Sequence, residues 1–338
     1  EKYGLYEAEC ASAMMSNFIV FPFSRPCGES IEPLNRAFQS GLKYGKLHFA
    51  LSSLGMTCPM LLLTKPLSQS EKRMREIVST QIQLLESGIH KYWSQGFWQQ
   101  TLNLMGSSDH MVELIGEAMQ EDEGYISCIP DPMAFANFYL RKLELSCYFG
   151  CHHLALKYVK LLECDDHVAS LQRVCPLIVS KHCFGGITYL AEAKCVKTRY
   201  YQRKAKKDLK SLSKLVDKGC IDAKPFYLVL KARFTAFQKK DVDSIRMDFD
   251  NAITAAIDCG FQGIAAFACE QAHRSLKEEC HEDTCGLQTK YWNSAMEYYT
   301  RWEAFGKVDQ MRELQRNDAE NFTAYSAPPS VVKVNVTD

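Results

Sequence analysis

Cysteine and histidine, which often serve as metal ligands or nucleophiles, come together at two places in this chain of 338 residues. The two clusters are Cys147-x3-Cys151-His152-His153 and Cys280-His281-x3-Cys285. A structural zinc site takes four ligands, usually as two close pairs, and neither cluster supplies two clean pairs. The sequence has no G-x-S-x-G or H-E-x-x-H motif. We therefore expect no metal site, no cofactor and no catalytic residue, so that the chain is not an enzyme.

A glycine-containing segment at 41–47 has a superficial likeness to a phosphate-binding loop. It reads G-L-K-Y-G-K-L, with three residues between the glycines where that loop requires four. Leu47 stands where the loop needs a hydroxyl group for Mg²⁺. Because the segment joins two predicted helices and follows no strand, we predict a helix-ending turn and no nucleotide site.

The strongest surface feature is a basic stretch at 194–218, where ten lysines and arginines are opposed only by Asp208 and Asp217. The local net charge is therefore +8. Such a stretch is typical of a solvated outer face, and it also suits a docking surface for an acidic domain or a polyanion. For docking, the candidate residues are Arg203, Lys204, Lys206, Lys207, Lys210 and Lys214. The acidic stretch 113–131 is a candidate internal partner for them.

Composition limits the classes of partner. Charged residues make up 24% of the chain and sum to zero, which favours neither nucleic acid nor a membrane as partner. No apolar run approaches the roughly 20 residues of a membrane-spanning helix. The fifteen cysteines are scattered through helical stripes, as at Cys147, Cys195, Cys259 and Cys269. We interpret them as buried free thiols in a reducing compartment and expect the protein in the cytoplasm.

Helices must position these side chains, because apolar residues recur every three or four positions through most of the sequence. The stripe at 241–258 is followed by Gly260, a typical helix-ending residue, and by Phe261, which opens the next stripe. The predicted helices lie at 7–18, 31–42, 47–61, 70–87, 91–105, 110–119, 133–149, 152–162, 174–197 with a break at Gly185-Gly186, 200–218, 225–237, 241–258, 261–276, 287–305 and 307–316.

The spacing of these helices indicates a stack of helical hairpins. Starts of successive pairs in the last third lie 36 to 46 residues apart, near the periods of helical repeats. Single hairpins cannot bury their stripes alone, so neighbours complete the core. We predict an all-α, tetratricopeptide-like α-α superhelix over 1–316, with a sub-division near 165–175. The segment 317–338 loses the periodicity, and we expect a disordered tail there.

Three segments resemble a known family. Cys259-Gly260-Phe261 with Ala266, Ala268 and Glu270 resembles the repeat turn N-G-F-x-x-x-x-A-x-A-x-E. Tyr299 and Trp302 through Lys307-Val308 resemble Y-x-x-W-G-A-x-x-K-V, the ending of the same helical region. The segment F-W-Q-Q-T-L-N-L-M-G at 97–106, with Glu117-Ala118-Met119, resembles the middle part of that region. Together they are similar to the tetratricopeptide-like region of large multidomain signalling ATPases, which occur in bacteria and diatom-like algae. Cys259 and Glu303 depart from the pattern, where it has asparagine and glycine.

The resemblance carries structural motifs and no catalytic residue. In that family the region follows kinase-like and AAA or STAND-type modules and often precedes histidine kinase or cyclase modules. It implies a non-catalytic interaction or sensor scaffold, whose concave groove binds a protein partner and biases a neighbouring module. One alternative is a fragment of an enzyme (an ATPase, kinase or nucleotide cyclase) whose catalytic module lies outside this chain. Another is a stand-alone adaptor.

Overall fold

The protein is described by a computed structural model over residues 2–84, 89–129, 132–163, 171–172, 174–239, 241–279 and 284–326. Within these ranges the chain is helical, and an isolated bridge between Ile115 and Gln120 is the only β-type pairing. The prediction of an all-α fold is therefore confirmed. The α-helices are α1 Lys2–Met15, α2 Ile31–Lys43, α3 Leu47–Gly55, α4 Cys58–Thr64, α5 Leu67–Leu84, α6 Ile89–Met105, α7 Glu123–Ser127, α8 Pro132–Tyr148, α9 His152–Leu161, α11 Cys175–Val196, α12 Arg199–Asp217, α13 Ala223–Phe237, α14 Val242–Asp258, α15 Gln262–Glu279, α16 Cys285–Trp302 and α17 Phe305–Ser326.

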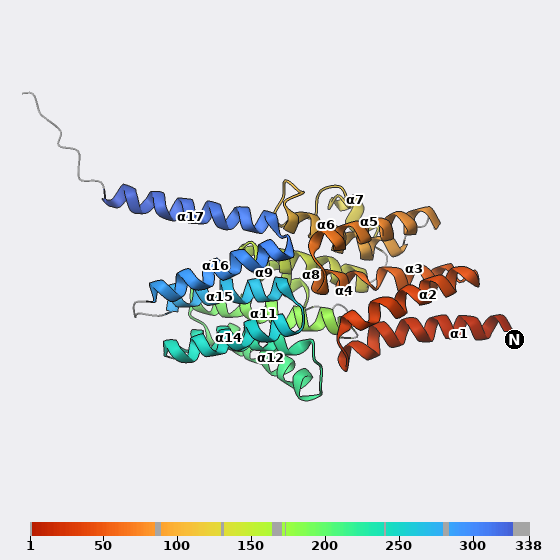
Figure 1. The fold of residues 1–338 in the computed structure, drawn as a ribbon, viewed down its shortest axis with the longest axis horizontal. Helices are drawn as coiled ribbons and strands as arrows, with labels where there is room; N and C mark the ends of the chain where they lie inside the picture. The colour runs from red at the N-terminus through yellow and green to blue at the C-terminus, as the bar shows by residue number, and fades with distance from the viewer. Residues whose placement is uncertain are drawn as a thin grey trace, which may run out of the picture.

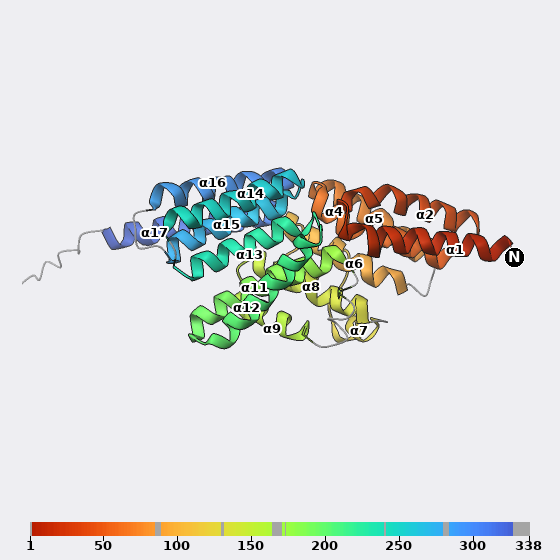
Figure 2. The ribbon, with the colours of Figure 1, turned by 90° about the horizontal axis from the view of Figure 1, so that it is seen from below.

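The second half of the chain is built from antiparallel helix pairs. Helix α11 packs against α12, α13 against α14, and α15 against α16. The first helices of successive pairs also contact one another, since α13 lies between α11 and α15. These pairs occupy one end of an elongated molecule, opposite the end formed by α1, α2 and α5 (Figures 1 and 2).

The two ends are joined through the centre. Helix α8 packs on both α6 and α11, and the short helix α4 reaches α11 and α15. The first turns of α17 return to α6, and beyond them α17 projects past the α13–α16 pairs (Figure 1). One large apolar cluster therefore runs from Phe18 to Met311, while a smaller cluster around Phe249 and Tyr291 fills the α13–α16 end.

Local signals explain where the helices begin and end. Asp241 precedes α14 and its carboxylate accepts a hydrogen bond from the backbone N–H of Ser244 at 2.8 Å, so it caps the helix. Gly260 follows with φ +75°, the left-handed conformation that ends a helix most easily on glycine. Phe261 then turns into the core, where it is 1% exposed. The stripe and turn predicted around Gly260 are thus present.

Two predictions inside the helical region are wrong. Residues 110–119 form no helix, because side chains of α6 satisfy the backbone of this segment instead. Gln99 accepts from the N–H of Ala118 at 3.0 Å, and the Asn103 amide donates to the carbonyl of Glu113 at 2.8 Å. The predicted break at Gly185-Gly186 is also absent. A Cβ on Gly186 would lie 2.6 Å from Leu230, so glycine lets α11 and α13 approach closely.

Other boundaries differ in detail. The predicted helix at 47–61 is two helices, α3 and α4, with Pro59 in the first turn of α4. By length and composition 47–64 could cross a membrane, but it is 61% buried, so its apolar side chains belong largely to the core. Helix α17 continues to Ser326, beyond the predicted end at 316. The rest of the predicted tail, 327–338, and most of the predicted sub-division at 165–175 lie outside the described residues.

Candidate functional site

Helix α12 carries the basic side chains predicted to form a docking surface. At 100° per residue, Arg203, Lys206, Lys207, Lys210 and Lys214 fall within an arc of about 100°. All five are exposed. We call these five residues the basic stripe. From Arg203 to Lys214 it extends about 16 Å along the helix.

The opposite side of α12 is buried. Ala205, Asp208 and Leu212 point into the molecule, where α12 packs on α11 and α13. Asp208 lies 2.6 Å from Nδ1 of His182 and 3.5 Å from Nζ of Lys181, both on α11. This carboxylate therefore does not screen the basic stripe, although its place in the sequence suggested that it would.

Lys204 does not belong to the exposed stripe. It is half-buried, and its ammonium group pairs with Glu163 and lies 5.3 Å from the ring centre of Tyr189. Burial acts to lower the pKa of Lys204, but hydrogen bonds to Glu163 and Tyr200 outweigh it and leave the pKa raised. Lys204 thus attaches α12 to the segment after α9, which corrects its assignment to the docking face.

Over its described residues, 113–129, the acidic stretch does not pair with the basic stripe. Glu117 lies 3.2 Å from Arg75 of α5, and Glu121 pairs with Lys142 of α8. Glu113 lies 3.0 Å from His110 in the same loop. Because these three carboxylates are paired elsewhere, the described part of the stretch is not the internal partner predicted for α12, and Asp131 lies outside the described residues.

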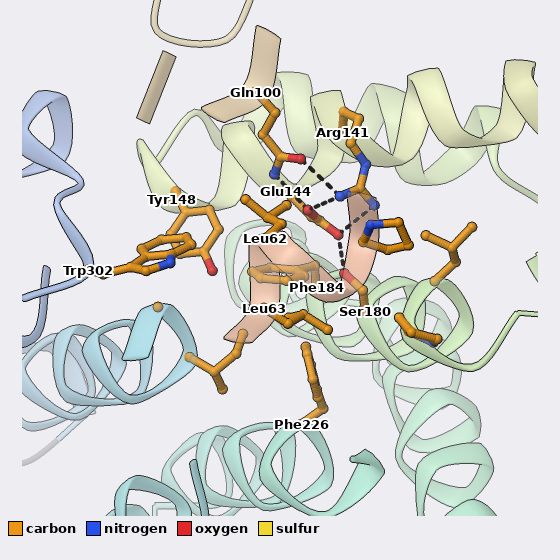
Figure 3. A pocket seen from close by; sticks show the side chains of 15 residues that line it. Leu62, Leu63, Gln100, Arg141, Glu144, Tyr148, Ser180, Phe184, Phe226 and Trp302 are labelled. Carbon is orange, nitrogen blue, oxygen red and sulfur yellow. Dashed lines mark hydrogen bonds and ion pairs between the residues drawn. The ribbon is translucent and has the colours of Figure 1, made fainter. Parts of the chain in front are cut away.

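A second candidate site lies at the centre of the molecule, and no sequence motif predicts it. Leu62 and Leu63 of α4, Phe226 of α13, and Tyr148 and Trp302 line a narrow cavity (Figure 3). Its volume is about 30 Å³, room for about two water molecules. Within the described residues, the Trp302 indole N–H has no hydrogen-bond acceptor, so it is suited to bind such a water.

One wall of this cavity is a buried polar network. The Arg141 guanidinium lies across the Glu144 carboxylate at 2.8 and 3.0 Å. Gln100 donates to the same carboxylate at 2.7 Å, and Ser180 also donates to it (Figure 3). Burial lowers the pKa of Arg141 and raises that of Tyr148 well above its ordinary value. With four donors on Glu144, the network is arranged to hold three helices together rather than to accept a proton.

The predicted absence of a metal site rests on two cysteine–histidine clusters. In the first, the Cys147 thiol lies 3.4 Å from the Thr188 hydroxyl and Cys151 follows the end of α8, so the two thiols face different surroundings. Residues 280–283 of the second cluster lie outside the described residues. Among those that are described, no three histidine, cysteine or acidic side chains are grouped as metal ligands.

Most cysteines have the environment that their helical positions predict. Eight of the described cysteines are buried and free, among them Cys147 and Cys269. Cys195 is exposed and Cys259 is only half-buried, so burial was wrongly expected for Cys195.

The motifs that carry the family resemblance are packing positions. Trp302 lies against Gly263, where a Cβ would come within 2.6 Å of the indole ring. Tyr299 donates to Glu270 at 2.9 Å, and Lys307 lies 2.9 Å from the same carboxylate. Glu270, Tyr299 and Lys307 thereby connect α15, α16 and α17. Comparison of the chain with known protein families, curated proteins and solved structures finds no match.

Proposed function

We propose that this chain is a non-catalytic scaffold, a tetratricopeptide-like α-α superhelix whose basic stripe docks an acidic segment of a protein partner or of a neighbouring module. The observation that carries the proposal is the basic stripe itself. Five exposed cations stand on one face of α12, and no ion pair between them and a described acidic side chain is found. Such a face attracts an acidic partner and steers its approach.

Two further features favour a scaffold. Successive helix pairs α11–α12, α13–α14 and α15–α16 pack as neighbours, as hairpin repeats do. The Glu144 carboxylate of the central polar network is occupied by donors of Gln100, Arg141 and Ser180, and the cavity beside it is too small for an ordinary substrate. The family resemblance adds a parent of the signalling ATPase type, and the many buried thiols favour work in the cytoplasm.

The docking proposal is tested by removing charge from the basic stripe. In the variant Arg203→Gln/Lys207→Gln/Lys210→Gln, affinity for a fluorescent glutamate-rich helical peptide should fall about tenfold at low salt. Three exposed ion pairs at about 0.5 kcal/mol each sum to about 1.5 kcal/mol, which corresponds to a tenfold change in affinity. The free energy of unfolding should change by less than about 1 kcal/mol, because the three side chains are solvated.

The matched control is Lys65→Gln/Lys72→Gln/Lys224→Gln, which removes the same charge from exposed lysines scattered over the surface. It should lose much less affinity than the stripe variant. Equal losses in the two variants would show a general charge effect and refute docking at the basic stripe. Binding of wild type that does not weaken between 50 and about 300 mM salt would refute it as well, because exposed pairs are screened.

A further inference from the structure

Two buried thiols meet at one place in the fold. The Sγ atoms of Cys175 and Cys220 are 3.2 Å apart, although the residues are separated by 45 positions in the sequence. Cys175 is the first residue of α11, and Cys220 lies in the turn between α12 and α13. They are 0% and 2% exposed. The fold therefore holds in contact two sulfur atoms at the open end of the α11–α12 hairpin, one from the start of α11 and one from the turn after α12.

The surroundings make the two thiols unequal. The hydrogen bond from Cys175 lowers the pKa of Cys220, and the same bond raises the pKa of Cys175 well above its ordinary value. The backbone N–H of Ala223 also favours the Cys220 thiolate, whereas the nearby carboxylate of Asp222 opposes it. Cys220 is thus the better nucleophile of the pair, and Cys175 is in position to attack Cys220 once it is oxidised.

A cavity lies beside the turn that carries Cys220. A cavity of about 290 Å³ is lined by Ile221 and Asp222, the two residues that follow Cys220, and by Cys27 across from them. Ile221 is 45% exposed, so the turn lies at the surface. The backbone N–H of Cys27 donates to Asp222 at 2.8 Å, which fixes the wall of the cavity next to the pair. A peroxide, not much larger than water, fits this cavity, and the buried sulfur atoms of Cys175 and Cys220 lie behind its lining residues.

We propose that Cys175 and Cys220 form a peroxide-sensitive dithiol that closes to a disulfide. The Cys220 thiolate attacks one oxygen of hydrogen peroxide and the O–O bond breaks, which leaves a sulfenic acid on Cys220 and, after protonation, one water. The Cys175 sulfur then attacks the Cys220 sulfur, the S–O bond breaks, and the departing hydroxide takes the Cys175 proton as a second water. Two electrons pass from the sulfurs to the peroxide. Two equivalents of a thiol such as glutathione restore both cysteines by exchange and leave as their own disulfide.

The disulfide encloses the helices α11 and α12 in one covalent loop. Because that loop contains the whole basic stripe, oxidation constrains the hairpin that presents the stripe. The inference itself rests on the contact between the two sulfur atoms and on the cavity beside the Cys220 turn, and it does not depend on docking at α12.

The experiment treats the full chain with hydrogen peroxide, alkylates the remaining thiols and maps disulfide-linked peptides by mass spectrometry. We expect the Cys175–Cys220 linkage to be the main product, to disappear on reduction, and to raise Tm by several degrees by constraining the unfolded chain. Cys269, which is buried, should stay a free thiol. If the pair stays reduced, or links no more often in the folded chain than in urea, the proposal is refuted.

Two variants separate the roles of the two thiols. In Cys175→Ser, whose hydroxyl can keep the hydrogen bond to Cys220, the Cys220 sulfenic acid should persist, and labelling of Cys220 by dimedone should increase severalfold over wild type. In Cys220→Ala, dimedone labelling of Cys175 should stay at the level of Cys269. Equal labelling of Cys175 and Cys220 in the two variants would refute the assignment of Cys220 as the attacking thiol.

Discussion

Glu303 holds a backbone conformation that glycine adopts more easily. It follows α16 with φ +68°, the left-handed region, at the position where the related pattern has glycine. Its side chain accepts a hydrogen bond at 2.7 Å from the backbone N–H of Ser68, in the first turn of α5. A carboxylate at a helix N-terminus is favourable, because the first N–H groups of a helix lack partners. The strain at Glu303 is therefore offset by a bond to a distant helix.

This balance predicts different outcomes for two substitutions. Glu303→Ala keeps the left-handed strain and loses the bond, so it should destabilise the fold by about 1 kcal/mol. Glu303→Gly loses the bond and relieves the strain, and should stay within about 0.5 kcal/mol of wild type. Urea unfolding of both, with Glu313→Ala on exposed α17 as control, measures the difference. A glycine variant no more stable than the alanine variant would contradict the strain argument.

Asp222 is a buried carboxyl whose charge the fold tolerates poorly. It is 1% exposed, and burial raises its pKa from 3.8 to about 6. Between these two values the folded protein holds a proton that the unfolded chain releases. The contribution of Asp222 to stability therefore falls as pH rises from about 4 to about 6, and stays low above that.

Replacement by asparagine should remove this pH dependence. The Asp222→Asn variant keeps an oxygen that can accept from the N–H of Cys27. Relative to wild type, we expect little difference at pH 4 and a gain of up to about 3 kcal/mol at pH 7, at about 1.4 kcal/mol per pKa unit. Urea unfolding at pH 4, 5, 6 and 7 measures it. An offset that is the same at every pH would contradict a raised pKa.

At the scale of elements, each hairpin depends on side chains that enter its neighbour. Phe261, at the start of α15, is 1% exposed, and its ring centre lies 6.2 Å from that of Phe226 on α13. The aromatic pair joins two successive hairpins. Loss of the Phe261 ring leaves a cavity between the two hairpins, and the alanine that replaces it cannot fill that cavity.

Phe261→Ala should therefore lower the free energy of unfolding by about 3–5 kcal/mol. Phe305→Ala is the matched control, because Phe305 also stands at the start of a helix but is 46% exposed. Its effect should be below about 1 kcal/mol. Urea unfolding of both variants measures the difference. Similar midpoints for Phe261→Ala and Phe305→Ala would place Phe261 outside the core.

Helices with one clear apolar stripe were predictable, and irregular segments were not. The stripe of α14 and the turn at Gly260 appear directly in the spacing of residues. The 110–119 segment has helix-like spacing too, but its backbone bonds go to Gln99 and Asn103, which no local pattern announces. The two glycines of α11 look like a break in sequence, because the close approach of Leu230 is visible only in the fold.

The same distinction applies to the candidate sites. The basic stripe lies on one helix, so a helical projection of the sequence finds it, although the pairing of Lys204 with Glu163 requires the structure. The central network takes Gln100, Arg141 and Ser180 from three helices. Residues on three separate helices form no local sequence pattern, so the network could not be predicted from the sequence.

At the scale of the whole molecule, the beginning of α17 is fixed where the two halves meet. Gly306 touches Gly106, at the end of α6, backbone against backbone. Gln310 of α17 also donates to the carbonyl of Phe149 at 2.8 Å, and Lys307 reaches Glu270 on α15. Three sites in the sequence, near 106, 149 and 270, are thus held by one turn of α17.

The contact between Gly106 and Gly306 leads us to expect a loss of stability when a side chain is added at Gly306. A Cβ on Gly306 would lie 2.8 Å from Cα of Gly106 and 2.9 Å from the carbonyl oxygen of Asn103. These are backbone atoms, which cannot turn aside as a side chain can, so Gly306→Ala must separate α17 from α6. We expect a loss of about 1–3 kcal/mol, as for other overpacked sites, together with faster hydrogen exchange in both helices.

Gly286→Ala provides the comparison within a neighbouring helix. Gly286 lies in the first turn of α16, and a Cβ there would meet no atom within 4 Å. Alanine should stabilise that helix by about 0.5–1 kcal/mol, since it reduces the freedom of the unfolded chain. Opposite signs for the two glycine variants would place the effect of Gly306 in the α6–α17 contact. If Gly306→Ala were also stabilising, or left exchange in α6 unchanged, the first turn of α17 would not join the two halves as inferred.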